Sequence, residues 1–115
     1  MRTITLHELK RLLDAGQPVI LVEVLAAHAY RKAHLPNAVN LPVSDLRRTA
    51  ERALPDKAAT IVVYCQNPRC GSAAKAASVL TELGYADVRE FREGKEAWLM
   101  AGYPVEGEAA SMPSA

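Results

Sequence analysis

The chain has 115 residues, of which 50% are hydrophobic and 23% are charged, and its formal net charge is +1. This length suits a single domain built around one core, and the charge balance gives no indication of a nucleic-acid or membrane partner. No apolar run reaches the roughly 18 residues that span a bilayer, and the first residues lead into a polar helical pattern rather than a signal peptide. We therefore expect a cytoplasmic protein.

Helical and strand-like patterns alternate along the chain. Thr5 and Glu8 have the spacing of a capping box at the start of the first helix, and Gly84 is expected to end the fourth. Helices are predicted from Thr5 until Gly16 and Pro18, at residues 26–32, from Ser44 to Pro55, at residues 72–83 and at about residues 95–101. Strands are predicted at residues 19–22, 38–41, 60–64 and 87–91.

This alternation is typical of an α/β domain with a mostly parallel sheet and helices on both faces. We expect the domain to cover residues 1–106, and the small, polar stretch 107–115 to form a disordered C-terminal tail. In such sheets the reactive loops lie at the carboxyl ends of the strands, which is where Cys65 falls.

Cys65 follows the strongest strand candidate and precedes a loop that leads into an alanine-rich helix. Backbone N–H groups of such a loop and the positive end of the helix dipole favour a thiolate, which makes Cys65 a candidate nucleophile. The alternative is an inert buried cysteine at a strand end. The candidate anion-binding loop consists of Gln66, Asn67, Pro68, Arg69, Cys70, Gly71 and Ser72.

Five motifs, in their order along the chain, resemble those of a single-domain rhodanese. They lie at residues 21–24 (Leu-Val-Glu-Val), 34–42 (His-Leu-Pro-Asn-Ala-Val-Asn-Leu-Pro), 62–65 (Val-Val-Tyr-Cys), 83–85 (Leu-Gly-Tyr) and 93–98 (Glu-Gly-Lys-Glu-Ala-Trp) with 102–105 (Gly-Tyr-Pro-Val), and Tyr30 lies between the first two. The resemblance extends from about Thr3 to Glu106. It implies a rhodanese-like fold with a five-stranded parallel sheet flanked by helices, in which Cys65 would carry a persulfide during sulfur transfer.

The residues of the loop suit this chemistry. A thiolate attacks the outer sulfur of a donor such as thiosulfate, keeps it as a persulfide and yields it to a thiol or cyanide acceptor, with no metal or organic cofactor. Because each intermediate is anionic, N–H donors between Gln66 and Ser72 would stabilise it and would lower the pKa of Cys65. Arg69 either holds an oxyanionic donor or is a solvated surface residue. Ser72 is expected to be the N-cap of the next helix.

Two stretches outside the loop depart from the usual rhodanese pattern. The first long strand generally reads Val-Asp-Val-Arg, whereas this chain has Glu23 in place of the aspartate and Leu25 in place of the arginine. The turn after the last strand has one glycine, Gly94, where two are common. We expect these changes to affect acceptor specificity more than the fold.

The loop itself is one or two residues longer than the six-residue loop typical of sulfurtransferases. It therefore also resembles the loop of dual-specificity cell-cycle phosphatases and arsenate reductases that share the fold. In those enzymes an arginine six positions after the cysteine clamps the phosphate or arsenate, but here that position is Gly71. The missing guanidinium disfavours phosphatase or arsenate reductase activity.

Cys70 leaves a third interpretation open. If the loop curls, Cys70 could resolve a persulfide or sulfenic acid on Cys65 and leave a reversible disulfide. The chain would then be a non-catalytic or redox-regulatory module that uses this pair. Alternatively, Cys70 is a small apolar residue that fills the underside of the loop. Zinc binding is disfavoured, because the cysteines and the three scattered histidines lack paired-ligand spacing.

The remaining polar residues in the motifs have structural interpretations. His34 is expected to form hydrogen bonds at a turn, and Trp98 is expected in the core. Glu93 and Lys95 are expected in a solvated turn, with a place at the pocket entrance as the alternative. The expected partners are therefore a small sulfur donor and a thiol or cyanide acceptor, and the sequence leaves the oligomeric state open.

Overall fold

The computed structural model describes residues 2–111, and its five strands form one sheet in the order β1-β5-β4-β2-β3. The strands are β1 (Arg2–Thr3), β2 (Ile20–Glu23), β3 (Val39–Asn40), β4 (Thr60–Tyr64) and β5 (Asp87–Glu90). All neighbouring strands are parallel. The predicted fold class is confirmed, and the sheet is parallel throughout rather than mostly so.

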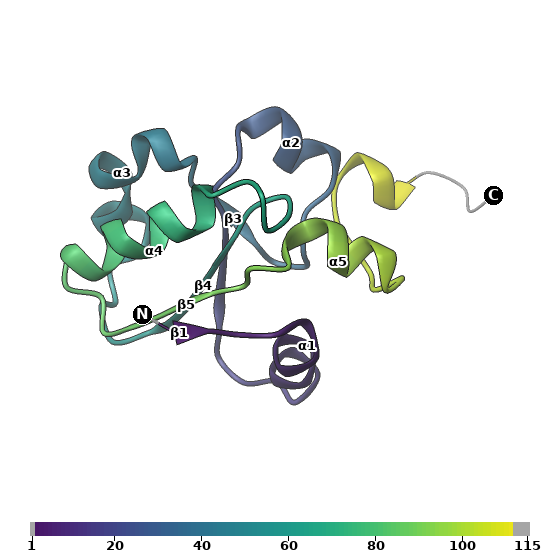
Figure 1. The fold of residues 1–115 in the computed structure, drawn as a ribbon, viewed down its shortest axis with the longest axis horizontal. Helices are drawn as coiled ribbons and strands as arrows, with labels where there is room; N and C mark the ends of the chain where they lie inside the picture. The colour runs from purple at the N-terminus through teal and green to yellow at the C-terminus, as the bar shows by residue number, and fades with distance from the viewer. Residues whose placement is uncertain (1, 112–115) are drawn as a thin grey trace.

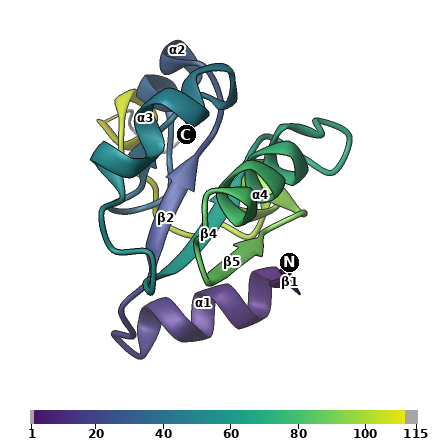
Figure 2. The same ribbon diagram turned by 90° about the vertical axis from the view of Figure 1, so that its left-hand side faces the viewer.

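Helices cover both faces of this sheet (Figures 1 and 2). They are α1 (Leu6–Asp14), α2 (Ala27–Lys32), α3 (Leu46–Ala53), α4 (Ser72–Glu82) and α5 (Gly94–Met100), with short 3-10 helices η1 (Val43–Asp45) and η2 (Glu108–Ser111). On one face α3 and α4 enclose a core around Leu46, Ile61 and Leu80. On the other, α1 and α5 enclose a second core around Leu9 and Trp98. No helix within residues 2–111 is long and apolar enough to cross a bilayer.

The local signals in the sequence explain where several helices begin and end. The predicted capping box is present: the Thr5 hydroxyl accepts the Glu8 N–H at 3.1 Å, and the Glu8 carboxylate accepts the Thr5 N–H at 2.9 Å. Gly84 comes directly after Leu83, the C-cap of α4, with φ +94, a left-handed conformation that favours glycine. The capping box and this glycine confirm the predicted start of α1 and the predicted end of α4.

The chain after the last motif folds back against α2. His34 and Glu106 form an antiparallel bridge with N···O distances of 3.0 and 2.9 Å. Gly107 follows at φ +105, where a Cβ atom would lie 2.7 Å from the Arg31 carbonyl oxygen. The structure therefore differs from the expected disordered tail at residues 108–111, which form η2, because this glycine permits a tight approach to α2. Residues 112–115 of the expected tail lie outside the described residues.

Candidate active site

Cys65 lies at the carboxyl end of β4, the middle strand of the sheet, with only 3% of its surface exposed. The following loop is held by the start of α5 through two backbone hydrogen bonds. The Lys95 N–H donates to the Cys65 carbonyl and the Glu96 N–H donates to the Gln66 carbonyl, each at 2.9 Å. The main chain of the loop is thereby attached to a second element besides β4.

Gly94 makes this attachment possible. A Cβ atom at this position would lie 2.7 Å from the carbonyl carbon and oxygen of Gln66 and 2.8 Å from the Asn67 nitrogen. Its φ of +76 is also unfavourable for residues with a side chain. The single glycine of this turn is thus required both by the backbone conformation and by the close approach of the loop.

The loop curls around Asn67. The Asn67 side-chain oxygen accepts the Arg69 N–H at 3.0 Å, and its main-chain carbonyl accepts the Cys70 N–H at 3.1 Å. The Asn67 amide also donates to the Glu96 carboxylate on α5 at 3.3 Å. This curl returns Cys70 toward Cys65: the Cys65 thiol lies 3.8 Å from the same Asn67 carbonyl oxygen that accepts the Cys70 N–H, and both cysteines are free.

The environment of Cys65 raises the pKa of its thiol to about 11. Burial is the largest cause, and the hydrogen bond with Cys70 adds to it. The backbone N–H groups of Ala73 and Gln66 act in the opposite direction but do not outweigh burial. The expected lowering of the pKa of Cys65 is therefore not found, because the sequence does not show how deeply the sulfur lies.

Cys70 is the more acidic member of the pair. Burial alone would raise its pKa, but hydrogen bonds with the Ser72 side chain, the Cys65 thiol and the N–H groups of Ser72 and Gln66 lower it to about 7. Near neutral pH the pair accordingly shares one negative charge, which resides mainly on the more exposed Cys70. The loop does gather N–H donors around sulfur, but around two sulfurs rather than one.

The remaining loop residues lie on the outer side. Pro68, Arg69 and Gly71 are exposed, so the side chain of Arg69 lies at the surface of the loop. Gly71, at φ +73, is the N-cap of α4, and Ser72 is the first residue of the helix. The prediction of Ser72 as the N-cap is therefore wrong by one residue: its side chain interacts with Cys70 instead of capping the helix.

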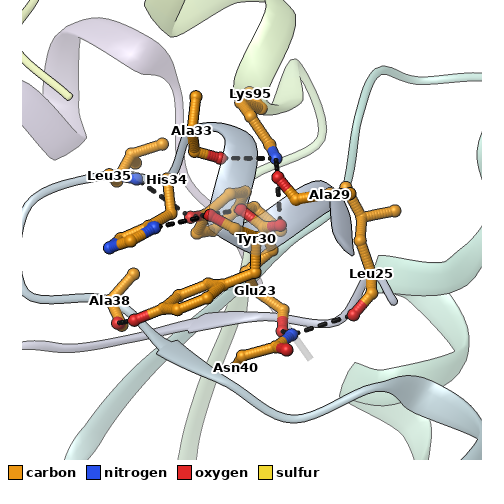
Figure 3. A network of polar contacts seen from close by, with 11 residues as sticks. Glu23, Leu25, Ala29, Tyr30, Ala33, His34, Leu35, Ala38, Asn40 and Lys95 are labelled. Carbon is orange, nitrogen blue, oxygen red and sulfur yellow. Dashed lines mark hydrogen bonds and ion pairs between the residues drawn. The ribbon is translucent and has the colours of Figure 1, made fainter. Parts of the chain in front are cut away.

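A buried ion pair lies beside the loop, between α5 and the sheet (Figure 3). The Lys95 ammonium donates to the Glu23 carboxylate at 2.9 Å, and the exposed fractions of the two side chains are 4% and 0%. It also donates to the carbonyl oxygens of Ala29 at 3.0 Å and Ala33 at 2.7 Å. The ion pair thus joins β2, α2 and α5, and the interpretation of Lys95 as part of a solvated turn is wrong.

Tyr64 completes this network next to Cys65. Its hydroxyl donates to the second oxygen of Glu23 at 2.9 Å and accepts the Leu35 N–H at 3.1 Å. Burial raises the pKa of Tyr64, and the adjacent Glu23 carboxylate raises it further, so the hydroxyl remains protonated. Glu23 stands where rhodaneses usually have an aspartate, and its positively charged partner is Lys95 of α5. The arginine that usually follows this strand is Leu25 in this chain.

His34 and Tyr30 stack beside the same network, with ring centroids 3.7 Å apart. The His34 Nδ1 atom lies 2.7 Å from the Tyr30 carbonyl oxygen, and the Tyr30 hydroxyl donates to the Ala38 carbonyl at 2.6 Å (Figure 3). These contacts confirm a structural role for His34. The described residues contain no buried side-chain nitrogen or oxygen without a hydrogen-bond partner.

A cavity of about 620 Å³ lies elsewhere, between β1, β5 and α1. Its lining contains Arg2, Arg11 and Arg89 but neither cysteine. We assign the candidate site to the Cys65 loop and not to this cavity, because both thiols lie in the loop. No group of three potential metal ligands lies together in the part of the chain that the structure describes.

The fold and this loop define an α/β domain that presents a cysteine at the carboxyl edge of a parallel sheet. The family model of the rhodanese-like domain matches residues 5–101, and the chain belongs to this family. The confirmed motifs of the sequence thus identified the family correctly.

Two relatives and one solved structure show how similar this chain is to known proteins. The HTH-type transcriptional regulator Rv0324 of Mycobacterium tuberculosis is 33% identical over 103 residues, covering 90% of this chain and 44% of that protein. Thiosulfate sulfurtransferase PspE of Escherichia coli is 33% identical over 67 residues, covering 58% of this chain and 62% of that protein. The crystal structure of BH2092 from Bacillus halodurans is 29% identical with a TM-score of 0.87, covering 98% of this chain and 82% of that one. The chain spans less than two thirds of the length of both curated relatives.

Proposed function

We propose that the protein is a sulfurtransferase that moves sulfane sulfur from a donor such as thiosulfate to a thiol or cyanide acceptor through a persulfide on Cys65. The observation that carries this proposal is the position of Cys65 at the carboxyl end of β4, with the N–H groups of Gln66 and Ala73 acting on its sulfur. The resemblance to PspE, a thiosulfate sulfurtransferase, supports the same donor class.

The first step requires a thiolate on Cys65. Near neutral pH the cysteine pair holds one proton, and the reactive form is the one in which this proton lies on Cys70 and the charge on Cys65. The Cys65 thiolate then attacks the outer sulfur of thiosulfate, forms the S–S bond and expels sulfite. The N–H groups of Gln66 and Ala73 stabilise the anionic sulfur during this step.

The second step returns the protein to its starting state. A thiolate or cyanide attacks the outer sulfur of the persulfide, and the Cys65 thiolate leaves with the electron pair of the S–S bond. Arg69 lies at the surface of the loop, where its positive charge attracts anionic donors and acceptors from solution. In this proposal Arg69 attracts the anionic donor and acceptor electrostatically and does not hold them in a buried pocket.

Intact-mass spectrometry after incubation with thiosulfate tests the proposal. We expect an adduct of about 32 Da, the mass of one sulfur atom, that is absent from Cys65→Ser and is lost when cyanide is added and thiocyanate forms. Cys70→Ser is the matched control, because the same substitution five positions later leaves the proposed carrier in place. Absence of both adduct and thiocyanate in the unaltered protein and in Cys70→Ser alike would refute the proposal, and an adduct on Cys65→Ser would refute the choice of Cys65.

A further inference from the structure

The contact between the two thiols has a chemical consequence for the persulfide. Cys65 and Cys70 are both free, the Cys65 thiol and the Cys70 N–H both contact the Asn67 carbonyl oxygen, at 3.8 and 3.1 Å, and Cys70 packs against the core cluster that contains Cys65. A Cys65 persulfide would therefore form within reach of a second sulfur nucleophile on the same loop. Among the residues that the structure describes, Cys65 and Cys70 are the only cysteines.

The exposure of the two side chains indicates that Cys70, and not Cys65, moves when the two sulfurs approach each other. Cys65 is buried, whereas Cys70 is half-buried and follows the exposed residues Pro68 and Arg69. A disulfide needs a sulfur–sulfur distance of about 2.0 Å, which is shorter than a hydrogen bond between thiols, so the loop must close slightly. Cys70 and its exposed neighbours can supply this movement, because Pro68 and Arg69 pack against no core cluster.

We propose that Cys70 attacks the Cys65 sulfur of the persulfide, releases the transferred sulfur as hydrosulfide and leaves a Cys65–Cys70 disulfide that a dithiol reductant must open. This inference rests on the proposed function and names a further catalytic residue and a second substrate class for the same site.

The step is balanced in atoms and electrons. The Cys70 thiol first passes its proton to the outer sulfur of the Cys65 persulfide. The Cys70 thiolate then forms a bond to the Cys65 sulfur, the bond between that sulfur and the outer sulfur breaks, and the outer sulfur leaves with the electron pair as HS⁻. The outer sulfur is reduced and the Cys70 sulfur is oxidised. A dithiol then reduces the disulfide by two exchange steps, becomes a disulfide itself and restores both thiols. The electrons that convert sulfane sulfur to sulfide thus come from the dithiol.

The charge distribution at the loop supports this order of events. The Ser72 side chain and the N–H groups of Ser72 and Gln66 favour a negative charge on Cys70, so its thiolate is available at neutral pH. The simpler alternative is that Cys70 only packs against the core under the loop, as its contact with the α3–α4 cluster allows. The two alternatives differ in whether a loaded persulfide survives without an external acceptor.

A single-turnover experiment distinguishes them. The reduced protein is loaded with thiosulfate, freed of excess donor and kept without acceptor, while sulfide and intact mass are followed in time. We expect the unaltered protein to release about one equivalent of sulfide and to become about 2 Da lighter than its reduced form, and added dithiothreitol to reverse the mass change. Cys70→Ser should keep its adduct of about 32 Da at least ten times longer and still yield thiocyanate with cyanide.

Each other outcome has a definite meaning. Equal persulfide lifetimes in the unaltered protein and Cys70→Ser, with thiocyanate formed by both, would refute the role of Cys70 and leave the proposed sulfurtransferase function intact. No adduct and no thiocyanate with either protein would refute the proposed function and this step with it. Cys70→Ala, compared by circular dichroism and by the same assay, controls for an altered loop in the serine variant.

Discussion

Removing the Lys95 ammonium should destabilise the protein far more than removing a surface ammonium. In Lys95→Met, the Glu23 carboxylate and the carbonyl oxygens of Ala29 and Ala33 lose their donor in a site where Glu23 is completely buried. Breaking a buried ion pair in this way typically costs about 3–5 kcal/mol of the free energy of unfolding. This is a large part of the roughly 5–15 kcal/mol that stabilises a typical domain.

Urea unfolding is a suitable assay, because Trp98 is 1% exposed and reports on the second core through its fluorescence. Lys10→Met is the matched control: it makes the same substitution in the ion pair with Asp14 on α1, whose aspartate is largely exposed. The control should cost less than about 1 kcal/mol. Equal losses in the two variants would refute the reasoning.

The charge on Glu23 accounts for most of the expected loss, so neutralising it should restore stability. In Glu23→Gln/Lys95→Met the amide oxygen can still accept the Tyr64 hydroxyl, and we expect at least half of the loss to be recovered. A double variant as unstable as Lys95→Met would contradict the electrostatic explanation.

Three further predictions follow from other contacts. Gly94→Ala should lower the free energy of unfolding, measured with urea, by about 2 kcal/mol more than Gly102→Ala does. Both glycines have φ near +77, but only at Gly94 would the new Cβ meet backbone atoms. Equal losses would contradict the close approach of the loop to Gly94. The hydrogen bond from Arg89 holds the pKa of Asp87 well below its usual range, so Asp87→Asn should lose about 1 kcal/mol of the free energy of unfolding at pH 7. This difference should shrink as the pH falls below about 4, because the unfolded chain then protonates Asp87 while the folded protein still holds it charged; a constant difference would exclude the linkage. Ser72→Ala should raise the pKa of Cys70 above its value of about 7, measured as a more alkaline midpoint for its alkylation by iodoacetamide, and an unchanged midpoint would show that the hydroxyl does not act on the thiol.

The long elements of the fold could be predicted from the sequence because their patterns are local. A stretch of about ten residues is enough to recognise each of three patterns: the capping box at Thr5, the apolar run of β4 and the alanine-rich helix α4. β1 was not predicted, because its two exposed residues show no periodicity and become a strand only by pairing with β5. The resemblance to the rhodaneses supplied the fifth strand that the pattern alone did not.

The site was predictable in position but not in its electrostatics. The strand-to-helix pattern placed Cys65 correctly at the edge of the sheet. The depth of its sulfur and the hydrogen bond with Cys70 depend on a curl at Asn67 that no spacing rule describes. Lys95 was missed for a similar reason: a lysine after a glycine is usually solvated, and the unpaired acidic residue in β2, Glu23, was the signal that could have found its partner.

The attachment of the loop to α5 has a consequence for how this site can diversify. The two hydrogen bonds from α5 reach carbonyl oxygens of residues 65 and 66, so they require a particular path of the main chain and no particular side chain in the loop. Mutations at positions 67–70 can thus change the chemistry offered to a substrate while the anchorage persists. Selection can therefore change the loop residues that contact a substrate while the sheet, α5 and the backbone hydrogen bonds that position the loop stay the same.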